Sequence, residues 1–299
     1  MTTTLRQATQ NPPGPTLKSQ VQSLLVRAGL YHRLKMSFLY DFYWQFADKK
    51  LVAARAREVQ FYQALLQGFR PGDLIFDVGA NQGHKTDIFL RLGAKVVAVE
   101  PDESNQRILR KLFLRLRLRK KPVVVLGSAL AEKNGVETMW IDQPGSAKNT
   151  LNQKWVETLR RDESRFGERL AFTEQKQVST TTLDDLIAEH GVPFFVKIDV
   201  EGAEPSVLRG LHRPVPYLSF EVNLPEFGSE GLECIELLSR VAPNGTFNWA
   251  VDCQRGFALT RWLKAGEFKS AFEACSEPSI EVFWASGAAD SGSRERAFA

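Results

Sequence analysis

The chain has 299 residues, of which 43% are hydrophobic and 25% charged, with a formal net charge of +4. This is the composition of an ordinary globular protein, the charge is too small to indicate a nucleic-acid partner, and no apolar run reaches the ~18 residues of a membrane span. Three widely spaced cysteines and a polar start without a signal-peptide core argue against disulfides or a zinc site and indicate a reducing, cytoplasmic location.

The first 68 residues are predicted to precede the main domain. Residues 1–18 are expected to be a flexible N-terminus, and residues 19–68 a helical extension, because apolar side chains recur there at helical spacing. Aromatic residues are dense in 38–46 and are flanked by lysine and arginine. This segment either rests on a membrane surface as a peripheral contact or packs against protein, and we favour packing against protein.

The next segment has the pattern of strand, glycine turn, helix and second strand, which is half of a nucleotide-binding α/β sheet. An apolar run over 74–78 carries Asp77 near its end and breaks into a turn that contains Gly79, Asn81 and Gly83. The glycines let the backbone approach a ligand, and Asn81 tolerates left-handed backbone angles. Glu100 ends the second strand, where its carboxylate could accept hydrogen bonds from both hydroxyls of a ribose.

The spacing of this turn separates two cofactor classes. A dinucleotide site requires Gly-x-Gly-x-x-Gly so that a pyrophosphate lies at the helix N-terminus. Here Asp77 leads the turn and Asn81 replaces the middle glycine. A leading acid suits a ligand with a cationic amino-acid portion and repels a pyrophosphate, so the pattern indicates S-adenosylmethionine, although ordinary strand–turn–helix units use such glycines too.

The middle of the chain offers weaker signals. Residues 110–121 carry seven basic side chains, which either attract an anionic acceptor or lipid headgroup or form the solvated face of a covering helix. A buried parallel strand is predicted over 122–126, and Ser128 and Ala129 after it are candidate contacts for an adenine ring. A strand over 136–141, a polar loop over 142–150 and a partly helical segment over 151–172 follow, and this region is expected to shape a substrate pocket.

The remaining elements are predicted to complete the sheet. Thr182 and Asp185 form a capping box that opens a helix ending at Gly191. Strands are expected over 193–198, 217–223, 246–251 and 280–285, a helix over 232–241, and a disordered tail over 286–299. Ligands of open α/β sheets bind at the carboxyl ends of strands, so Asp77, Glu100 and Asp199 are expected to converge there. Glu204 is interpreted as a carboxylate that favours the positive N-terminus of the next helix.

Four sequence blocks together resemble the FkbM-type methyltransferase family. They are 77–83 with Thr86, Glu100-Pro101, 182–186, and the Val-Lys-Ile-Asp-Val-Glu-Gly-Ala-Glu segment 196–204, which is the most specific. The resemblance covers about residues 70–225 and implies a class I S-adenosylmethionine-dependent methyltransferase: an α/β, Rossmann-like mixed sheet with helices on both faces. We assign residues 69–285 to this domain. Such enzymes commonly methylate a hydroxyl of a sugar, glycolipid or secondary metabolite, so the expected partner is a small-molecule or glycan acceptor.

Methylation of a hydroxyl requires that its proton be removed or its pKa lowered, by a base or by a metal ion. Asp199 is the first candidate for base or metal ligand because it ends a strand beside the cofactor site. Glu221 and Asn223 share one face of the next strand and could complete with Asp199 an oxygen-rich site for a divalent cation such as Mg²⁺. Alternatively, Asp199 orients the cofactor and Glu221 caps a neighbouring helix.

Two other functions remain open from the sequence. A nucleotide-linked oxidoreductase uses a similar half-sheet, but Asp77 and the missing middle glycine disfavour it. A non-catalytic module could keep the fold and lose the chemistry. The intact set of Asp77, Glu100 and Asp199 argues against that possibility.

Overall fold

A computed structural model describes residues 49–115, 122–161 and 170–287. The predicted flexible N-terminus, most of the helical extension with its aromatic segment, the end of the basic run and the tail beyond 287 lie outside these residues. The chain divides into two compact units, 1–53 and 54–299, and nearly all described residues belong to the second. The division falls inside helix α4 (Lys49–Leu65), whose residues Phe61, Tyr62 and Leu65 are buried in the core of the second unit.

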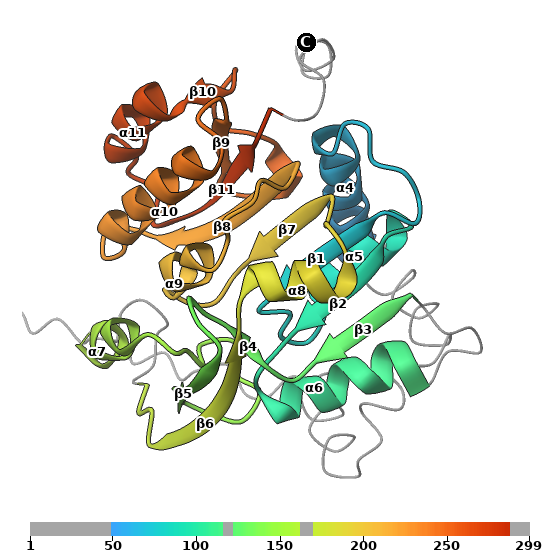
Figure 1. Cartoon of the computed structure of the whole chain (residues 1–299), viewed down its shortest axis with the longest axis vertical. Helices are drawn as coiled ribbons and strands as arrows, with labels where there is room; N and C mark the ends of the chain where they lie inside the picture. The colour runs from blue at the N-terminus through green and yellow to red at the C-terminus, as the bar shows by residue number, and fades with distance from the viewer. Residues whose placement is uncertain (1–48, 116–121, 162–169, 288–299) are drawn as a thin grey trace, which may run out of the picture. The chain divides into compact units, whose positions relative to one another are not determined.

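The main sheet has eight strands in the order β10-β9-β11-β8-β7-β1-β2-β3 (Figure 1). Five are parallel: β3 (Val123–Leu126), β2 (Lys95–Val99), β1 (Leu74–Val78), β7 (Phe195–Ile198) and β8 (Tyr217–Asn223). Strand β11 (Ser279–Ala285) inserts antiparallel between β8 and β9 (Thr246–Ala250), and the short β10 (Leu263–Lys264) lies at the edge. The predicted mixed sheet with an antiparallel finish is confirmed.

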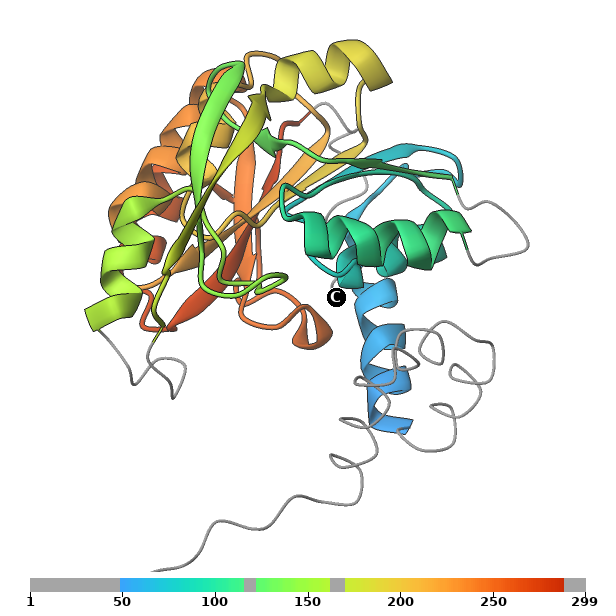
Figure 2. The same ribbon diagram turned by 90° about the horizontal axis from the view of Figure 1, so that it is seen from below.

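Helices cover both faces of this sheet, as the two views show (Figures 1 and 2). One face packs against α4, α5 (His84–Arg91) and α6 (Glu103–Arg110), which continues as a π-helical turn, η1 (Lys111–Arg115). The other face packs against α8 (Leu183–His190), α9 (Glu204–Arg209), α10 (Gly228–Val241) and α11 (Ala265–Glu273). Successive strand residues alternate between the two cores, as Ile75 and Phe76 do. Burial on both sides explains the nearly continuous apolar runs of the parallel strands.

A smaller sheet lies beside the carboxyl end of β3. Its strands are β4 (Ala129–Leu130), β6 (Glu174–Thr181) and β5 (Gly135–Ile141), in that order, and α7 (Gln153–Arg161) precedes β6. Strand β5 confirms the predicted strand over 136–141. Strand β6 was not predicted because its residues are almost all polar and only Val178 and Thr180 are buried. Pairing with β5, rather than a hydrophobic pattern, makes this segment a strand.

Two local signals were predicted correctly. Thr182 caps α8: its Oγ1 accepts a hydrogen bond from the backbone N–H of Asp185 at 3.0 Å and donates one to the Asp185 carboxylate at 2.7 Å. Gly191 ends the same helix with φ of 96°, in the left-handed region that favours glycine. The helix therefore stops four residues before β7, which delivers Asp199 to the sheet edge.

The described part of the chain holds no helix with the length and apolar character of a membrane span. All three cysteines, Cys234, Cys253 and Cys275, carry free thiols in this structure. A short 3-10 turn, η2 (Cys253–Arg255), places Cys253 against the sheet.

Candidate functional site

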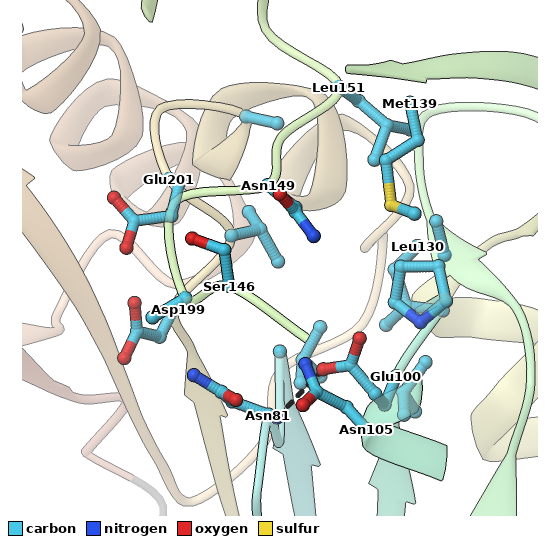
Figure 3. A pocket seen from close by; sticks show the side chains of 18 residues that line it. Asn81, Glu100, Asn105, Leu130, Met139, Ser146, Asn149, Leu151, Asp199 and Glu201 are labelled. Atoms are coloured by element: carbon cyan, nitrogen blue, oxygen red, sulfur yellow. Dashed lines mark hydrogen bonds between the residues drawn. The ribbon is translucent and has the colours of Figure 1, made fainter. Parts of the chain in front are cut away.

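Three strand ends meet at the centre of the main sheet. Strand β1 pairs in parallel with β2 on one side and with β7 on the other, and Val78 is in register with Val99 and with Ile198. The residues that follow these three, Gly79, Glu100 and Asp199, therefore lie side by side at the carboxyl edge. Ligands of open α/β sheets bind where the connections diverge in this way. A cavity lies at this point, here called the central cavity, and all three residues line it (Figure 3).

The turn after β1 is fixed by the backbone. Gly79 has φ of 76°, and a Cβ at this position would lie 1.8 Å from the carbonyl oxygen of Asp199. Asn81 has φ of 47°, and its backbone N–H donates to the Glu100 carboxylate at 2.7 Å. Asn81 lines the central cavity (Figure 3), and its side-chain oxygen is buried without a hydrogen-bond partner. A buried acceptor without a partner is costly, so it marks a place for a donor on a ligand.

Glu100 is held so that both of its carboxylate oxygens keep lone pairs for a ligand. One oxygen accepts from the N–H of Asn81 and the other from the N–H of Asp102, at 2.7 and 2.8 Å. Burial raises the pKa of the Glu100 carboxyl to about 7, against the stabilising effect of these two hydrogen bonds. Hydroxyl donors on a ligand would favour the ionised form and lower that pKa again. The amide oxygen of Asn105 nearby is also buried without a partner.

The predicted pocket-forming loop 142–150 does reach this cavity. The carboxylate of Asp102 accepts from the N–H of Gly145 at 2.9 Å and from the Asn149 side chain at 2.8 Å, which ties the loop to the start of α6. Ser146 and Asn149 thereby line the cavity opposite Glu100 (Figure 3). The wall beyond them is apolar and is formed by Ala129, Leu130, Met139 and Leu151. An apolar wall next to a carboxylate suits a planar base attached to a sugar.

Three of the predicted cofactor contacts do not line the central cavity. Asp77 is fully buried in β1: one oxygen accepts from the Thr86 hydroxyl, the other has no partner, and burial raises its pKa. Gly83 begins α5, where a Cβ would lie 2.7 Å from Leu109 and Phe113 of α6 and η1. Ser128 follows β3 outside the lining, whereas Ala129 is part of it. Asp77 and Gly83 therefore support the turn through contacts within the protein, on the side away from the central cavity.

Carboxylates gather on the opposite side of the cavity from Glu100. Oxygens of Asp199, Glu201 and Glu221 all lie within 4.8 Å of one another. Asp199 also accepts from the ammonium of Lys197 at 2.6 Å, and the Lys197 side chain is only 4% exposed. Burial opposes ionisation of Asp199, but Lys197 outweighs it and holds the pKa of this carboxyl below its usual range. Burial and repulsion from Asp199 raise the pKa of Glu221 to about 8.

Glu201 enters this cluster through a strained turn. Its φ is 55°, unusual for a residue with a long side chain. The Thr150 hydroxyl donates to the carbonyl of Glu201 at 2.8 Å, the Asn152 amide donates to the carbonyl of Gly202, and Glu204 accepts from the N–H of Val200 at 3.0 Å. Burial, followed by repulsion from Asp199, raises the pKa of Glu201. Sequence reasoning did not name Glu201 as a site residue, although its place in the VKIDVEGAE block was an available signal.

A second cavity, of about 340 Å³, adjoins the carboxylates on the other side and is here called the polar cavity. It is lined by the ends of β7, β8 and β9, the start of β11, and residues of α4 and α5. Asp199 lines both cavities, and Glu221 lines the polar one. Asn223 lines neither of these two: it lines a smaller cavity toward α10, together with Glu221, Glu204 and Cys234. Of the three residues predicted as a metal set, Glu221 thus shares the polar cavity with Asp199 and the smaller cavity with Asn223.

Lys197 belongs to a buried polar row that sequence reasoning missed. Asp77, Lys197 and Ser219 are register partners across β1, β7 and β8, and the Ser219 hydroxyl donates to Glu281 of β11 at 2.7 Å. The Glu281 carboxylate also accepts a hydrogen bond from the Cys253 thiol at 3.3 Å and lies 3.8 Å from the Lys85 ammonium. Single polar residues inside apolar strands were the signal for this row.

Comparisons with known proteins identify a family and several similar solved structures. The family model described as Methyltransferase FkbM domain matches residues 77–241. No curated protein matches the chain. Among solved structures, the methyltransferase FkbM from Methylobacillus flagellatus is similar with 16% identity and a TM-score of 0.44, covering 72% of this chain and 44% of that one. The chain thus spans less than half the length of that protein.

Two further structures are similar at lower identity. A TehB-like SAM-dependent methyltransferase from Corynebacterium glutamicum shares 12% identity with a TM-score of 0.38, covering 81% of this chain and 96% of that one. The plantazolicin methyltransferase in complex with SAH shares 10% identity with a TM-score of 0.40, covering 90% of this chain and 98% of that one.

Proposed function

The chain belongs to the FkbM methyltransferase family, and from this premise we propose that it transfers a methyl group from S-adenosylmethionine to a hydroxyl of a small-molecule or glycan acceptor. One observation carries the proposal: Asp199 lines both the central cavity, which suits a nucleoside, and the polar cavity, which suits a hydroxylated acceptor. A carboxylate between two such cavities is where a hydroxyl proton and an activated methyl group would meet.

The residues of the central cavity fit S-adenosylmethionine. Glu100 is placed to accept from the two ribose hydroxyls, and the wall of Ala129, Leu130 and Met139 to cover the adenine. The buried oxygens of Asn81 and Asn105 lack partners and fit donors such as the amino groups of the ligand. When bound, the sulfonium supplies a methyl group reactive enough that the protein mainly has to align the acceptor.

Asp199 is the candidate base. Lys197 keeps its carboxylate ionised at neutral pH, while Glu221 has a pKa of about 8 and stays protonated there. A hydroxyl entering from the polar cavity would therefore meet one anionic acceptor beside a neutral carboxyl. The acceptor oxygen would lose its proton to Asp199 while its bond to the methyl carbon forms and the sulfur–methyl bond breaks, with S-adenosylhomocysteine as the leaving group. General-base assistance of this kind usually contributes a factor of about 10²–10⁴.

A divalent cation is the second candidate arrangement for the same carboxylates. The grouping of Asp199, Glu201 and Glu221 favours it, because oxygen ligands of this kind suit Mg²⁺. In that case the ion would lower the pKa of the acceptor hydroxyl, and Glu201 would take the position that the sequence assigned to Asn223. The ammonium of Lys197 already neutralises the Asp199 carboxylate at 2.6 Å, which favours the metal-free arrangement.

Calorimetric titration with S-adenosylmethionine, S-adenosylhomocysteine and NAD tests the cofactor first. We expect binding of the first two and none of NAD, and the reverse result would support an oxidoreductase. A methyl-transfer assay on a panel of glycans and hydroxylated metabolites then separates an enzyme from an inactive cofactor-binding module. Repeating the assay after EDTA treatment separates the base from the metal arrangement, since only the metal arrangement loses activity that Mg²⁺ restores. The cytoplasmic location inferred from the cysteines stays a prediction.

A further inference from the structure

The polar cavity has the size and position of a binding site for a small molecule. Its volume of about 340 Å³ lies within the range of ligand pockets, and it opens beside Asp199 at the carboxyl end of β7. Side chains from α4, α5, β8, β9, η2 and β11 line it, so it is built by segments distant in the sequence. Most of these side chains are polar, unlike the apolar lining of a typical ligand pocket.

Charge in this cavity is strongly biased to one sign. Five carboxyl side chains line it, and only two ammonium groups, Lys85 and Lys197, oppose them; the carboxyl groups are those of Glu58, Asp199, Glu221, Asp252 and Glu281. Burial disfavours the charged form of Glu281, but Lys85 and Lys197 outweigh it and hold its pKa below the usual range. Even when Glu221 is protonated, the other four carboxyl groups outnumber the two ammonium groups.

Neither ammonium group is available to an anionic ligand. Lys197 is buried and donates to Asp199 at 2.6 Å. Lys85 is hydrogen-bonded to Glu58 and lies 3.8 Å from Glu281. A carboxylate or phosphate entering the cavity would have to displace one of these pairs or remain beside an excess of carboxylates. Both alternatives are unfavourable, because charges interact strongly where water is partly excluded.

Hydroxyl groups find both kinds of hydrogen-bonding partner here. Asp252 offers acceptor oxygens and Gln254 offers an amide with both functions, whereas the two oxygens of Glu281 already accept from Ser219 and Cys253. Ser279 donates to Glu221 at 3.1 Å and keeps lone pairs for a ligand. We propose that the polar cavity selects uncharged, polyhydroxylated acceptors and rejects acceptors with a carboxylate or phosphate next to the methylated hydroxyl. The inference rests on the proposed function only in taking this cavity as the acceptor site.

The test compares two probes that differ in one group, methyl β-glucopyranoside and its uronate, in which a carboxylate replaces the hydroxymethyl group. Ligand-detected NMR titration of the full chain, saturated with S-adenosylhomocysteine, measures binding without turnover. We expect the glucoside to bind at least about tenfold more tightly than the uronate. This ratio of dissociation constants, here called the gap between the two probes, should narrow at high salt because salt screens the repulsion between the uronate and the carboxylates of the cavity. Equal or tighter binding of the uronate, or no binding of either probe, would overturn the proposal.

Two variants assign the discrimination to the cavity. Asp252→Asn removes one carboxylate at the rim and keeps an oxygen that can accept from the N–H of Gln254, as Asp252 does at 2.9 Å. Glu281→Gln removes a buried one, while Lys85 keeps Glu58 as its partner. Each is expected to reduce the gap between the two probes by roughly threefold or more. Glu137→Gln, on an exposed face of β5, is the matched control and should leave the gap unchanged.

The outcomes keep the two proposals apart. Glucoside preference without methyl transfer to any acceptor would leave the charge selection intact and refute the enzymatic function. Methyl transfer with equal efficiency to neutral and anionic acceptors would support the enzymatic function and refute the charge selection. An unchanged gap in both Asp252→Asn and folded Glu281→Gln would remove the carboxylates of the cavity from the explanation.

Discussion

The carbonyl oxygen of Asp199 occupies the space beside Gly79 so closely that a Cβ on this glycine would lie 1.8 Å from it. The turn after β1 and the loop after β7 therefore cross in direct contact at the edge of the central cavity. The sequence suggested that Gly79 is a glycine so that a ligand can approach. The structure gives a different reason: the crossing itself excludes a side chain, whether or not a ligand is present.

Gly79→Ala should therefore reduce stability as well as cofactor binding. We expect a loss of about 2–5 kcal/mol in the free energy of unfolding, from positive φ plus overpacking, measured by urea denaturation. Gly72→Ala is the matched control, because Gly72 also has positive φ, of 100°, but no atom within 4 Å of its added Cβ. It should lose only about 1–2 kcal/mol, the cost of the backbone conformation. Equal losses in the two variants would contradict the role of the crossing.

Glu100→Ala should weaken binding of S-adenosylhomocysteine by about 1.5–3 kcal/mol, the usual cost of losing hydrogen bonds to a charged group. Calorimetry of the folded variant measures the effect. Glu103→Ala, three residues further on and largely exposed, is the control and should bind like the parent. Unchanged affinity in Glu100→Ala would exclude this carboxylate from the cofactor site.

The pH dependence of binding offers an independent test of Glu100. The pKa of its carboxyl is about 7 without ligand, and ribose hydroxyls bind the ionised form. Affinity for S-adenosylhomocysteine should therefore rise as pH increases from 6 to 8 and then level off, by up to about tenfold per unit below the pKa. Glu100→Gln cannot ionise and should show weak affinity without this rise. A parent affinity that falls over the same range would contradict the assignment.

Asp199→Asn should retain most of the cofactor affinity and lose turnover by about 10²–10⁴-fold, the range for removing general-base assistance. It also leaves buried Lys197 without its anionic partner, so thermal unfolding should show some loss of stability. Lys197→Met in the same chain removes that unpaired charge and should recover stability but not turnover. Full turnover in Asp199→Asn would show that Asp199 has no role in the mechanism. Loss of cofactor binding would show instead that Asp199 positions the cofactor.

Stability of the ligand-free protein should fall as pH rises from about 5 to 8. Burial raises the pKa of Glu100 and Glu204 to about 7 and that of Glu221 to about 8, from 4.5. A carboxyl with a raised pKa in the folded state retains a proton that the unfolded chain has lost, so folding weakens over this interval, by up to about 1.4 kcal/mol per unit and group.

Glu204→Gln tests this dependence outside the candidate base. Glutamine can still accept from the N–H of Val200, but it does not titrate. Urea unfolding between pH 5 and 8 should give a shallower decline than in the parent. The exposed Glu137→Gln variant should decline like the parent, and identical slopes in all three proteins would contradict the prediction.

Much of the fold followed from local patterns. Parallel strands buried on both faces give apolar runs, and turns that need positive φ use glycine, so β1, β2, β7 and β8 were predicted with nearly their observed bounds. The position of Glu100 and Asp199 at strand ends placed both at one sheet edge, because parallel strands in register end together. Strand β6 was missed, since its polar residues become a strand only by pairing with β5.

Long-range register and packing decided the rest of the site. Local sequence predicted that Asp77 and Gly83 contact the ligand. In the structure Asp77 is buried within β1 and Gly83 packs against α6, so neither lines the central cavity. Spacing along one strand joined Asn223 to Glu221, and these two line one small cavity; the turn after Asp199 adds Glu201, whose carboxylate lies within 4.8 Å of those of Asp199 and Glu221. The sequence by itself determined which residues end the strands. Only the tertiary structure decided which side chains share a cavity and which charges they meet there, because these depend on distances between segments far apart in the chain.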